Sequence, residues 1–152
     1  MVAGNHELSF DERTIEECRD YMKQAGEDHH LEMSVPEVKA LLTNCIYLED
    51  QAVEVMGIRF YGSPWQPMYS NSAFQRARGQ ELRRMWEKIP SDTQVLVTHS
   101  PPLGAGDYCY KHNADRVSVS PAGRSGCQDL MTELVERIKP KYHVFGHVHE
   151  GG

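Results

Sequence analysis

Residues 94–102, which read Gln-Val-Leu-Val-Thr-His-Ser-Pro-Pro, give the strongest indication of the fold. Their first half is a short apolar run rich in β-branched side chains, which is typical of a buried strand. A second such run covers residues 142–145 and leads into Gly-His-Val-His. His99 and His147 are therefore each expected just beyond the carboxyl end of a strand.

The segments before these two strands have the apolar spacing of helices. They cover residues 79–89 and 125–139, and each stops at a proline, Pro90 or Pro140. Earlier in the chain we expect helices at residues 10–23 and 36–42, and strands at 45–48, 53–56 and 58–62. Alternating elements predict an α/β layered fold, in which ligands bind outside the carboxyl ends of the strands.

A third motif, Gly4-Asn5-His6-Glu7, stands near the start of the chain. Neutral imidazole nitrogen and amide oxygen bind Mn²⁺, Fe or Zn²⁺ well, whereas Mg²⁺ prefers an all-oxygen shell. Asn5, together with the histidines that follow the two strands, therefore points to a divalent transition metal. Glu7 is interpreted as a helix cap or as a support for the ligands.

The three motifs together resemble the calcineurin-like metallophosphoesterases, and within them the animal metallophosphoesterase-domain proteins of the brain type. The resemblance also runs through residues 41–48, 61–65, 78–80 and 139–147, and it covers almost the whole chain. It implies one calcineurin-like phosphoesterase domain over residues 1–152. The expected fold is a partial four-layer α/β/β/α sandwich that lacks the N-terminal and C-terminal strands.

The resemblance also implies a role for each candidate site residue. Asn5, His99 and His147 resemble the ligands of the second metal of a dinuclear site, and His149 resembles a ligand of the first metal. His6 resembles the proton donor to the leaving group. The implied substrate is a small-molecule phosphoester or a nucleotide, and the implied cofactor is Mn, Fe or Zn.

Two further motifs of that family, Asp-x-His and Gly-Asp, stand upstream of Gly-Asn-His-Glu, where this sequence has only three residues. The missing aspartates include the carboxylate that bridges both ions. We therefore expect a truncated chain with one weak metal site and impaired activity, because in-line displacement uses two ions about 3.5–4 Å apart. Two function classes remain open: a metal-dependent phosphoesterase, or a non-catalytic remnant that binds one metal or a nucleotide weakly.

The composition of the chain argues against nucleic-acid and membrane partners. The 152 residues carry a formal net charge of −6, with a pI near 5.7 and a mean hydropathy of −0.58. This leaves no basic surface for nucleic acid, and no stretch is long and apolar enough for a signal peptide or a membrane span. A cytoplasmic protein without nucleic-acid or membrane partners is expected.

Four other features receive predictions from their sequence context. The cysteines, with no metal-binding spacing, are expected to be free thiols: Cys45 and Cys127 buried, Cys109 exposed. Trp65 is expected at the rim of the cleft, and Trp86 and His143 in the core or on a sheet face. The loop at residues 104–126 either holds phosphate or is variable surface. Its basic and phenolic candidates are Tyr108, Tyr110, Lys111, Arg116 and Arg124.

Overall fold

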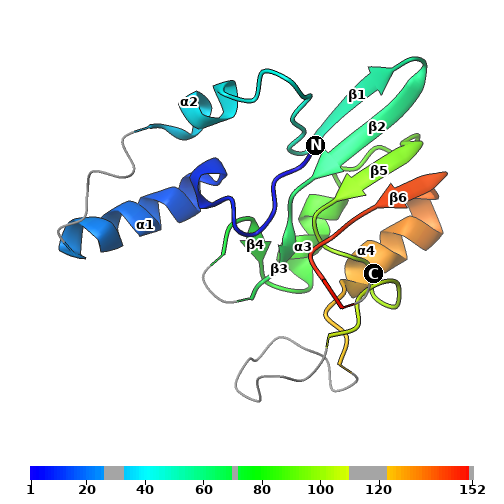
Figure 1. Cartoon of the computed structure of the whole chain (residues 1–152). Helices are drawn as coiled ribbons and strands as arrows, with labels where there is room; N and C mark the ends of the chain where they lie inside the picture. The colour runs from blue at the N-terminus through cyan, green and yellow to red at the C-terminus, as the bar shows by residue number, and fades with distance from the viewer. Residues whose placement is uncertain (26–32, 70–71, 110–122, 151–152) are drawn as a thin grey trace.

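The computed structural model describes residues 1–25, 33–69, 72–109 and 123–150 (Figure 1). It is a mixed α/β structure, as the sequence predicts. In chain order the elements are η1 (Leu8–Phe10), α1 (Glu12–Ala25), α2 (Val35–Ala40), β1 (Gln51–Val55), β2 (Ile58–Ser63), β3 (Gln66–Pro67), β4 (Gln75–Arg76), α3 (Gln80–Trp86), β5 (Val95–Thr98), α4 (Gln128–Glu133), the π-helical turn η3 (Leu134–Ile138) and β6 (Tyr142–Val144).

The central sheet has four strands in the order β1-β2-β5-β6. The first two form an antiparallel hairpin, whose turn residues Met56 and Gly57 have positive φ angles of 52° and 75°. Two consecutive residues of positive φ suit the twist of a two-residue hairpin. β2, β5 and β6 are parallel to one another, so their carboxyl ends lie at one edge of the sheet.

One face of this sheet is covered by helices α3 and α4 (Figure 1). The strand register aligns Tyr61, Leu96 and His143 across β2, β5 and β6, which places the three side chains on the same face. Tyr61 and Leu96 belong to the main core, together with Leu82 and Trp86 of α3 and Leu130 of α4. The core therefore lies between the sheet and the two helices, and Trp86 is a core residue as predicted.

The opposite face of the sheet is apolar but uncovered. Register places Phe60, Val95, Val97, Tyr142 and Val144 there. None of these five side chains is buried, and Tyr142 and Val144 are 69% and 55% exposed. The prediction that residues 142–145 form a buried strand is therefore wrong for this face, because β6 is the edge of the sheet and no described element packs over it.

The N-terminal third packs beside the sheet. Helix α2 begins with a capping box, in which Ser34 and Glu37 exchange hydrogen bonds between side chain and backbone. Residues 45–48, predicted as a strand, form none: the Leu48 N–H donates to the Met1 carbonyl at 2.8 Å, but no ladder develops. Cys45 is exposed, not buried as predicted, because it lies in this irregular segment.

Of the remaining predictions on single residues, some are confirmed and one is wrong. The described cysteine side chains, Cys45, Cys109 and Cys127, are free thiols as predicted, and Cys127 is buried. Trp65 is not at a rim: it is 9% exposed, and its indole N–H donates to the Asp50 carboxylate at 2.8 Å. Of the described helices, none has the length and apolar character needed to cross a membrane.

Candidate metal centre

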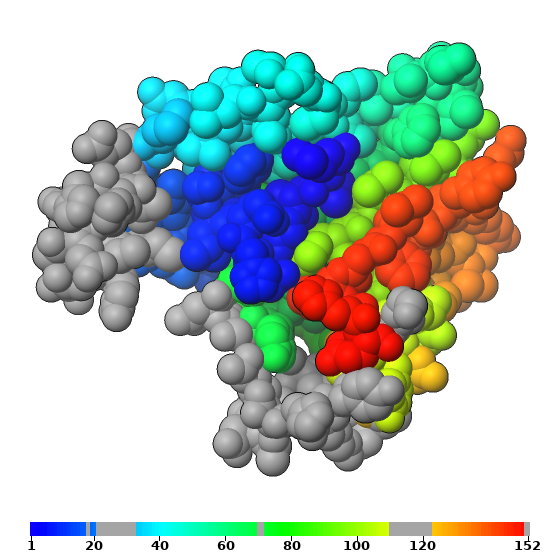
Figure 2. Space-filling model, viewed as in Figure 1, coloured from blue at the N-terminus to red at the C-terminus, as the bar shows by residue number. Residues whose placement is uncertain are grey.

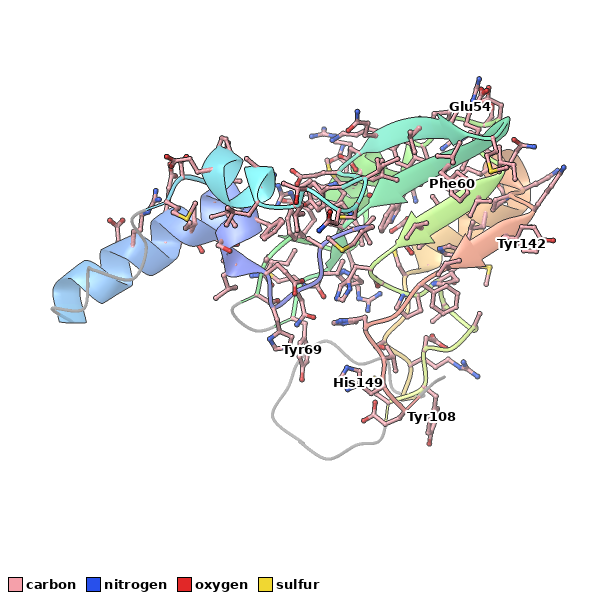
Figure 3. The ribbon with its side chains drawn as sticks, turned by 45° about the horizontal axis from the view of Figure 1, so that its top comes forward. Glu54, Phe60, Tyr69, Tyr108, Tyr142 and His149 are labelled. Carbon is pink, nitrogen blue, oxygen red and sulfur yellow. The ribbon has the colours of Figure 1, made fainter. Side chains whose placement is uncertain are left out.

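The three sequence motifs meet at the carboxyl edge of the sheet. His99 follows β5, His147 follows β6 by three residues, and Asn5 comes from the irregular segment before η1. Figure 2 shows the N-terminal residues, in dark blue, beside the red C-terminal segment on one face of the molecule. In Figure 3 His149 lies at the opposite end of the strands from Glu54 and Tyr142.

Asn5 and His99 are in direct contact across 94 residues of sequence. The peptide N–H of Asn5 donates to Nε2 of His99 at 3.2 Å, which requires a lone pair on that nitrogen. Asn5 Oδ1 lies 3.0 Å from the same nitrogen and is itself an acceptor. With Nε2 unprotonated, its single lone pair lies beside the lone pairs of Oδ1, and an ion bound at Nε2 would take the place of the Asn5 N–H.

This spacing fits a shared cation. Bonds of about 2.0–2.2 Å from a transition metal to nitrogen and oxygen place two ligand atoms roughly 2.8–3.1 Å apart at an octahedral angle and roughly 3.3–3.6 Å apart at a tetrahedral angle. The 3.0 Å separation between Nε2 and Oδ1 lies in the octahedral range. An imidazole and a carboxamide are also the donor types that Mn²⁺, Fe and Zn²⁺ accept. Asn5 and His99 therefore fit as two ligands of one ion.

His147 stands next to His99. Their ring centroids are 4.7 Å apart in an edge-to-face arrangement. Burial, with smaller contributions from the nearby His147 and His6, lowers the pKa of His99 to about 4. Burial likewise lowers the pKa of His147, with smaller contributions from His149 and His6. Both rings are therefore neutral at pH 7, which is the form that binds metal.

The backbone at His147 is strained. Its φ angle is 72°, and the Val148 N–H donates to the Gly146 carbonyl at 2.9 Å across it. This is a γ-turn of positive φ, a rare conformation whose cost is of the order of 1–3 kcal/mol. The Gly146 N–H donates to the His99 carbonyl at 3.1 Å, so the turn is fixed to the loop after β5. Strain of this kind is typical of functional loops.

Glycine is required at position 4 because the His99 ring lies against it. A Cβ there would stand 2.8 Å from His99 Cε1 and 2.9 Å from Glu7 Oε2. The Gly4 N–H donates to the Glu7 carboxylate. Glu7 makes no side-chain cap of η1, so of its two predicted roles the structure favours support of the Gly-Asn-His-Glu turn.

Two anchors of this turn were not foreseen from the sequence. The Asn5 carbonyl accepts a hydrogen bond from the Ala73 N–H at 3.0 Å. Asp11 is the residue before α1. Its carboxylate accepts hydrogen bonds from the Phe74 N–H at 2.8 Å and from the Thr14 hydroxyl at 2.8 Å. Ala73 and Phe74 stand at no recognisable sequence spacing from the Gly-Asn-His-Glu motif, so the sequence does not mark them as its partners.

The convergence is incomplete. Within the described parts of the chain, no three His, Cys, Asp or Glu side chains come close enough together to hold one ion. His6 and His149 lie near enough to His147 to lower its pKa, but neither closes a ligand set. The structure thus places Asn5 against His99 and His99 against His147. The five predicted site residues lie near one another but do not form a complete set of metal ligands.

Of the five loop residues considered for phosphate binding, only Tyr108 and Arg124 lie in the described structure. Tyr108 is 47% exposed. Arg124 donates to the carboxylate of Asp107 at 2.6 Å, and the Asp107 side chain is fully buried. This ion pair gives Arg124 a role in closing the base of the loop.

Comparison with known proteins identifies the family of this chain. The family model for the calcineurin-like phosphoesterase matches residues 1–151. The chain belongs to this family. Human metallophosphoesterase domain-containing protein 1 is 42% identical over 159 residues, which cover 99% of this chain and 44% of that protein. The Caenorhabditis elegans UPF0046 protein C25E10.12 is 40% identical over 150 residues, 99% of this chain and 49% of that protein.

The mouse metallophosphoesterase domain-containing protein 1 matches to the same extent as the human one. The chain spans less than half the length of each of these relatives. Membership of the calcineurin-like phosphoesterase family supports a phosphoesterase type of function and a divalent metal. The activity, substrate and partners of the whole protein belong to the proposal that follows.

Proposed function

We propose that this chain is a calcineurin-like phosphoesterase domain whose carboxyl sheet edge holds one divalent transition metal, Mn, Fe or Zn, for phosphoester hydrolysis. The observation that carries the proposal is the 3.0 Å contact between Asn5 Oδ1 and the lone-pair nitrogen of His99, beside the His147 ring. In this proposal Asn5, His99 and His147 hold the ion. Residues 1–152 form the domain, and its location is cytoplasmic.

The other two residues take the remaining roles. His6, next in sequence to Asn5, protonates the leaving oxygen, a function that typically contributes about 10²–10⁴-fold to rate. His149, on the far side of the γ-turn from Gly146, is the one candidate ligand at the other position of a dinuclear site, and alone it does not hold an ion. Asn5, His99 and His147 would hold the ion, which would supply polarisation of a phosphoryl oxygen and activation of a water nucleophile. The substrate is a small phosphoester or a nucleotide.

A second candidate is a binding protein without catalysis. It is favoured by the absence of any three-residue His, Cys, Asp or Glu cluster among the described residues. Asparagine and two histidines leave the charge of the ion uncompensated, so the site is weak, and the second position has only His149. The two candidates differ in whether a bound ion is accompanied by turnover.

Metal stoichiometry and hydrolysis decide between them. We expect equilibrium dialysis of the 152-residue chain against Mn²⁺ or Zn²⁺ to return at most one weakly bound ion, lost in His99→Ala and His147→Ala. Two tightly held ions would contradict the single-site proposal. Mn²⁺-dependent hydrolysis of aryl phosphates or phosphodiesters that disappears in His6→Ala supports the enzyme, whereas a bound ion with background hydrolysis supports the binding protein.

A further inference from the structure

A chain of polar groups crosses from β6 to β5 behind the metal centre. Register aligns His143 with Leu96, so His143 and Thr98 lie on the helix-covered face of the sheet. Thr98 is 2% exposed and Ser100 is fully buried. Nε2 of His143 lies 2.8 Å from the Thr98 hydroxyl oxygen. Thr98 is the last residue of β5, so this contact lies directly before His99.

The hydrogen on each group follows from counting donors. The Thr98 hydroxyl has one hydrogen, and it donates to the Ser100 carbonyl at 2.7 Å. The same oxygen can then only accept from His143, so Nε2 of His143 carries a proton. Burial lowers the pKa of His143 to about 4, which keeps the ring neutral at pH 7 and leaves Nδ1 without a proton.

The hydrogen bonds from His143 to Thr98 and from Thr98 to Ser100 fix two residues that flank His99. The peptide of His99 is held on its other sides by its N–H, which donates to the Ser63 carbonyl at 3.2 Å, and by its carbonyl, which accepts from Gly146 at 3.1 Å. β2, β5 and the segment after β6 thus all contribute to the position of one imidazole. The His143 link is the contribution made by side chains.

We propose that His143 is a positioning residue for His99: its protonated Nε2 holds the Thr98 hydroxyl, which holds the Ser100 carbonyl and so orients the ligand between them. This inference rests on the proposed function to the extent that His99 binds metal. It assigns His143 a role beyond filling the core. Ring packing alone cannot replace that role, because a ring without a donor leaves the Thr98 oxygen without its partner.

Matched variants separate the donor from the ring. His143→Gln can place an amide N–H near the position of Nε2, and His143→Phe keeps a ring without a donor. Thr98→Ser keeps the hydroxyl, and Thr98→Val removes it. We expect Mn²⁺ or Zn²⁺ affinity to fall about tenfold in His143→Phe and in Thr98→Val, the lower end of the effect of groups that orient ligands. His143→Gln and Thr98→Ser stay within about threefold of the parent chain on the same reasoning.

The double variant sharpens this expectation. His143→Phe combined with Thr98→Val should bind metal no more weakly than either single variant, because both remove the same link. Additive losses would overturn the proposal, and so would equal affinity in His143→Phe and His143→Gln. Unfolding midpoints of all variants are measured alongside. If His143→Phe does not fold, the Thr98→Val and Thr98→Ser pair decides by the same criterion.

A second readout needs no metal. Nitrogen-15 NMR of the 152-residue chain should show His143 with a protonated Nε2 and a bare Nδ1. The His99 ring signals should shift in His143→Phe and keep their positions in His143→Gln. The opposite tautomer, or His99 signals that ignore both substitutions, would overturn the proposal. Failure to bind Mn²⁺ or Zn²⁺ with these NMR results intact would reject the proposed function and retain the positioning of His99.

Discussion

The two faces of the four-stranded sheet are built from the same apolar residue types but have different surroundings. On one face Leu96 and Tyr61 are buried against Trp86 and Leu130. On the other face, one residue along the same strand, Val97 is only partly buried, and Val144 on the neighbouring strand is 55% exposed. Residue type therefore does not tell which face of a strand contributes more to stability. The face that the helices cover contributes more, because its side chains are buried.

The largest expected difference between the faces is in folding stability. Leu96→Ala leaves a cavity in the helix-covered core and should lower the free energy of unfolding by about 3–5 kcal/mol. Val97→Ala, on the adjacent residue of the opposite face, should cost under about 1 kcal/mol because the side chain is already in contact with solvent. Urea unfolding followed by circular dichroism measures both. Equal losses would mean that the second face is covered in solution.

The metal centre lies at the edge where the two faces end, and Gly4 tests how tightly that edge is packed. Gly4→Ala places a methyl group 2.8 Å from the His99 ring and should cost about 1–3 kcal/mol of stability. It should also weaken metal binding. Gly146→Ala is the matched control, because a Cβ at Gly146 meets nothing within 4 Å. A stable Gly4→Ala chain with unchanged His99 NMR signals would show that the ring is free to move.

The burial of His99 and His143 predicts a pH dependence of stability. The pKa values of His99 and His143 are about 4 in the folded chain and near 6.5 in the unfolded one, so the unfolded state binds more protons. Stability is thus full above pH 6.5, falls as the pH drops from 6.5 to 4, and levels off below that. We expect a loss of about 2 kcal/mol per histidine by pH 5.

Unfolding free energies at pH 7 and pH 5 measure this loss. His143→Gln, which has no titratable ring, should reduce the difference between the two pH values by less than half, since His99 and His147, whose pKa values are also lowered, remain. An unchanged difference would show that His143 takes up its proton in the folded state as readily as in the unfolded one.

The smallest effect concerns the uncovered face. Val144→Lys should change the free energy of unfolding by less than about 0.5 kcal/mol, because the side chain is exposed. It should instead reduce self-association, since uncovered apolar faces and free sheet edges favour it. Sedimentation velocity over a range of concentrations measures this. Val135→Lys, a substitution at a 61% exposed position in η3, is the control and should leave association unchanged.

The sequence was sufficient where local pattern decides the structure. The apolar runs before His99 and His147 are strands, and the segments that end at Pro90 and Pro140 contain helices. Residues 45–48 show the limit of this approach. Their apolar character predicts a strand, but a strand needs a partner, and the pairing with Met1 stops after two hydrogen bonds, to Leu48 and Ile46.

The same division applies to the site. The predicted strand ends placed His99 and His147 side by side, because parallel strands end at one edge, and the family resemblance added Asn5 to them. It could not predict the Thr98 and His143 link, which depends on the register of β5 against β6. Nor could it assign Arg124 to Asp107, because an arginine in a loop has the same sequence signature whether it binds phosphate or a carboxylate.

The contact between Asn5 and His99 also has a consequence for the order of folding. It joins residues 94 positions apart, further than any other hydrogen bond recorded among the described residues. Closing a long loop costs entropy that is recovered only when the intervening elements are in place, and contacts between residues far apart in the sequence form slowly. The sheet and its helices should therefore assemble first, and the two ligands meet last. A metal ion added to the refolding chain should then slow its unfolding and leave the rate of folding almost unchanged.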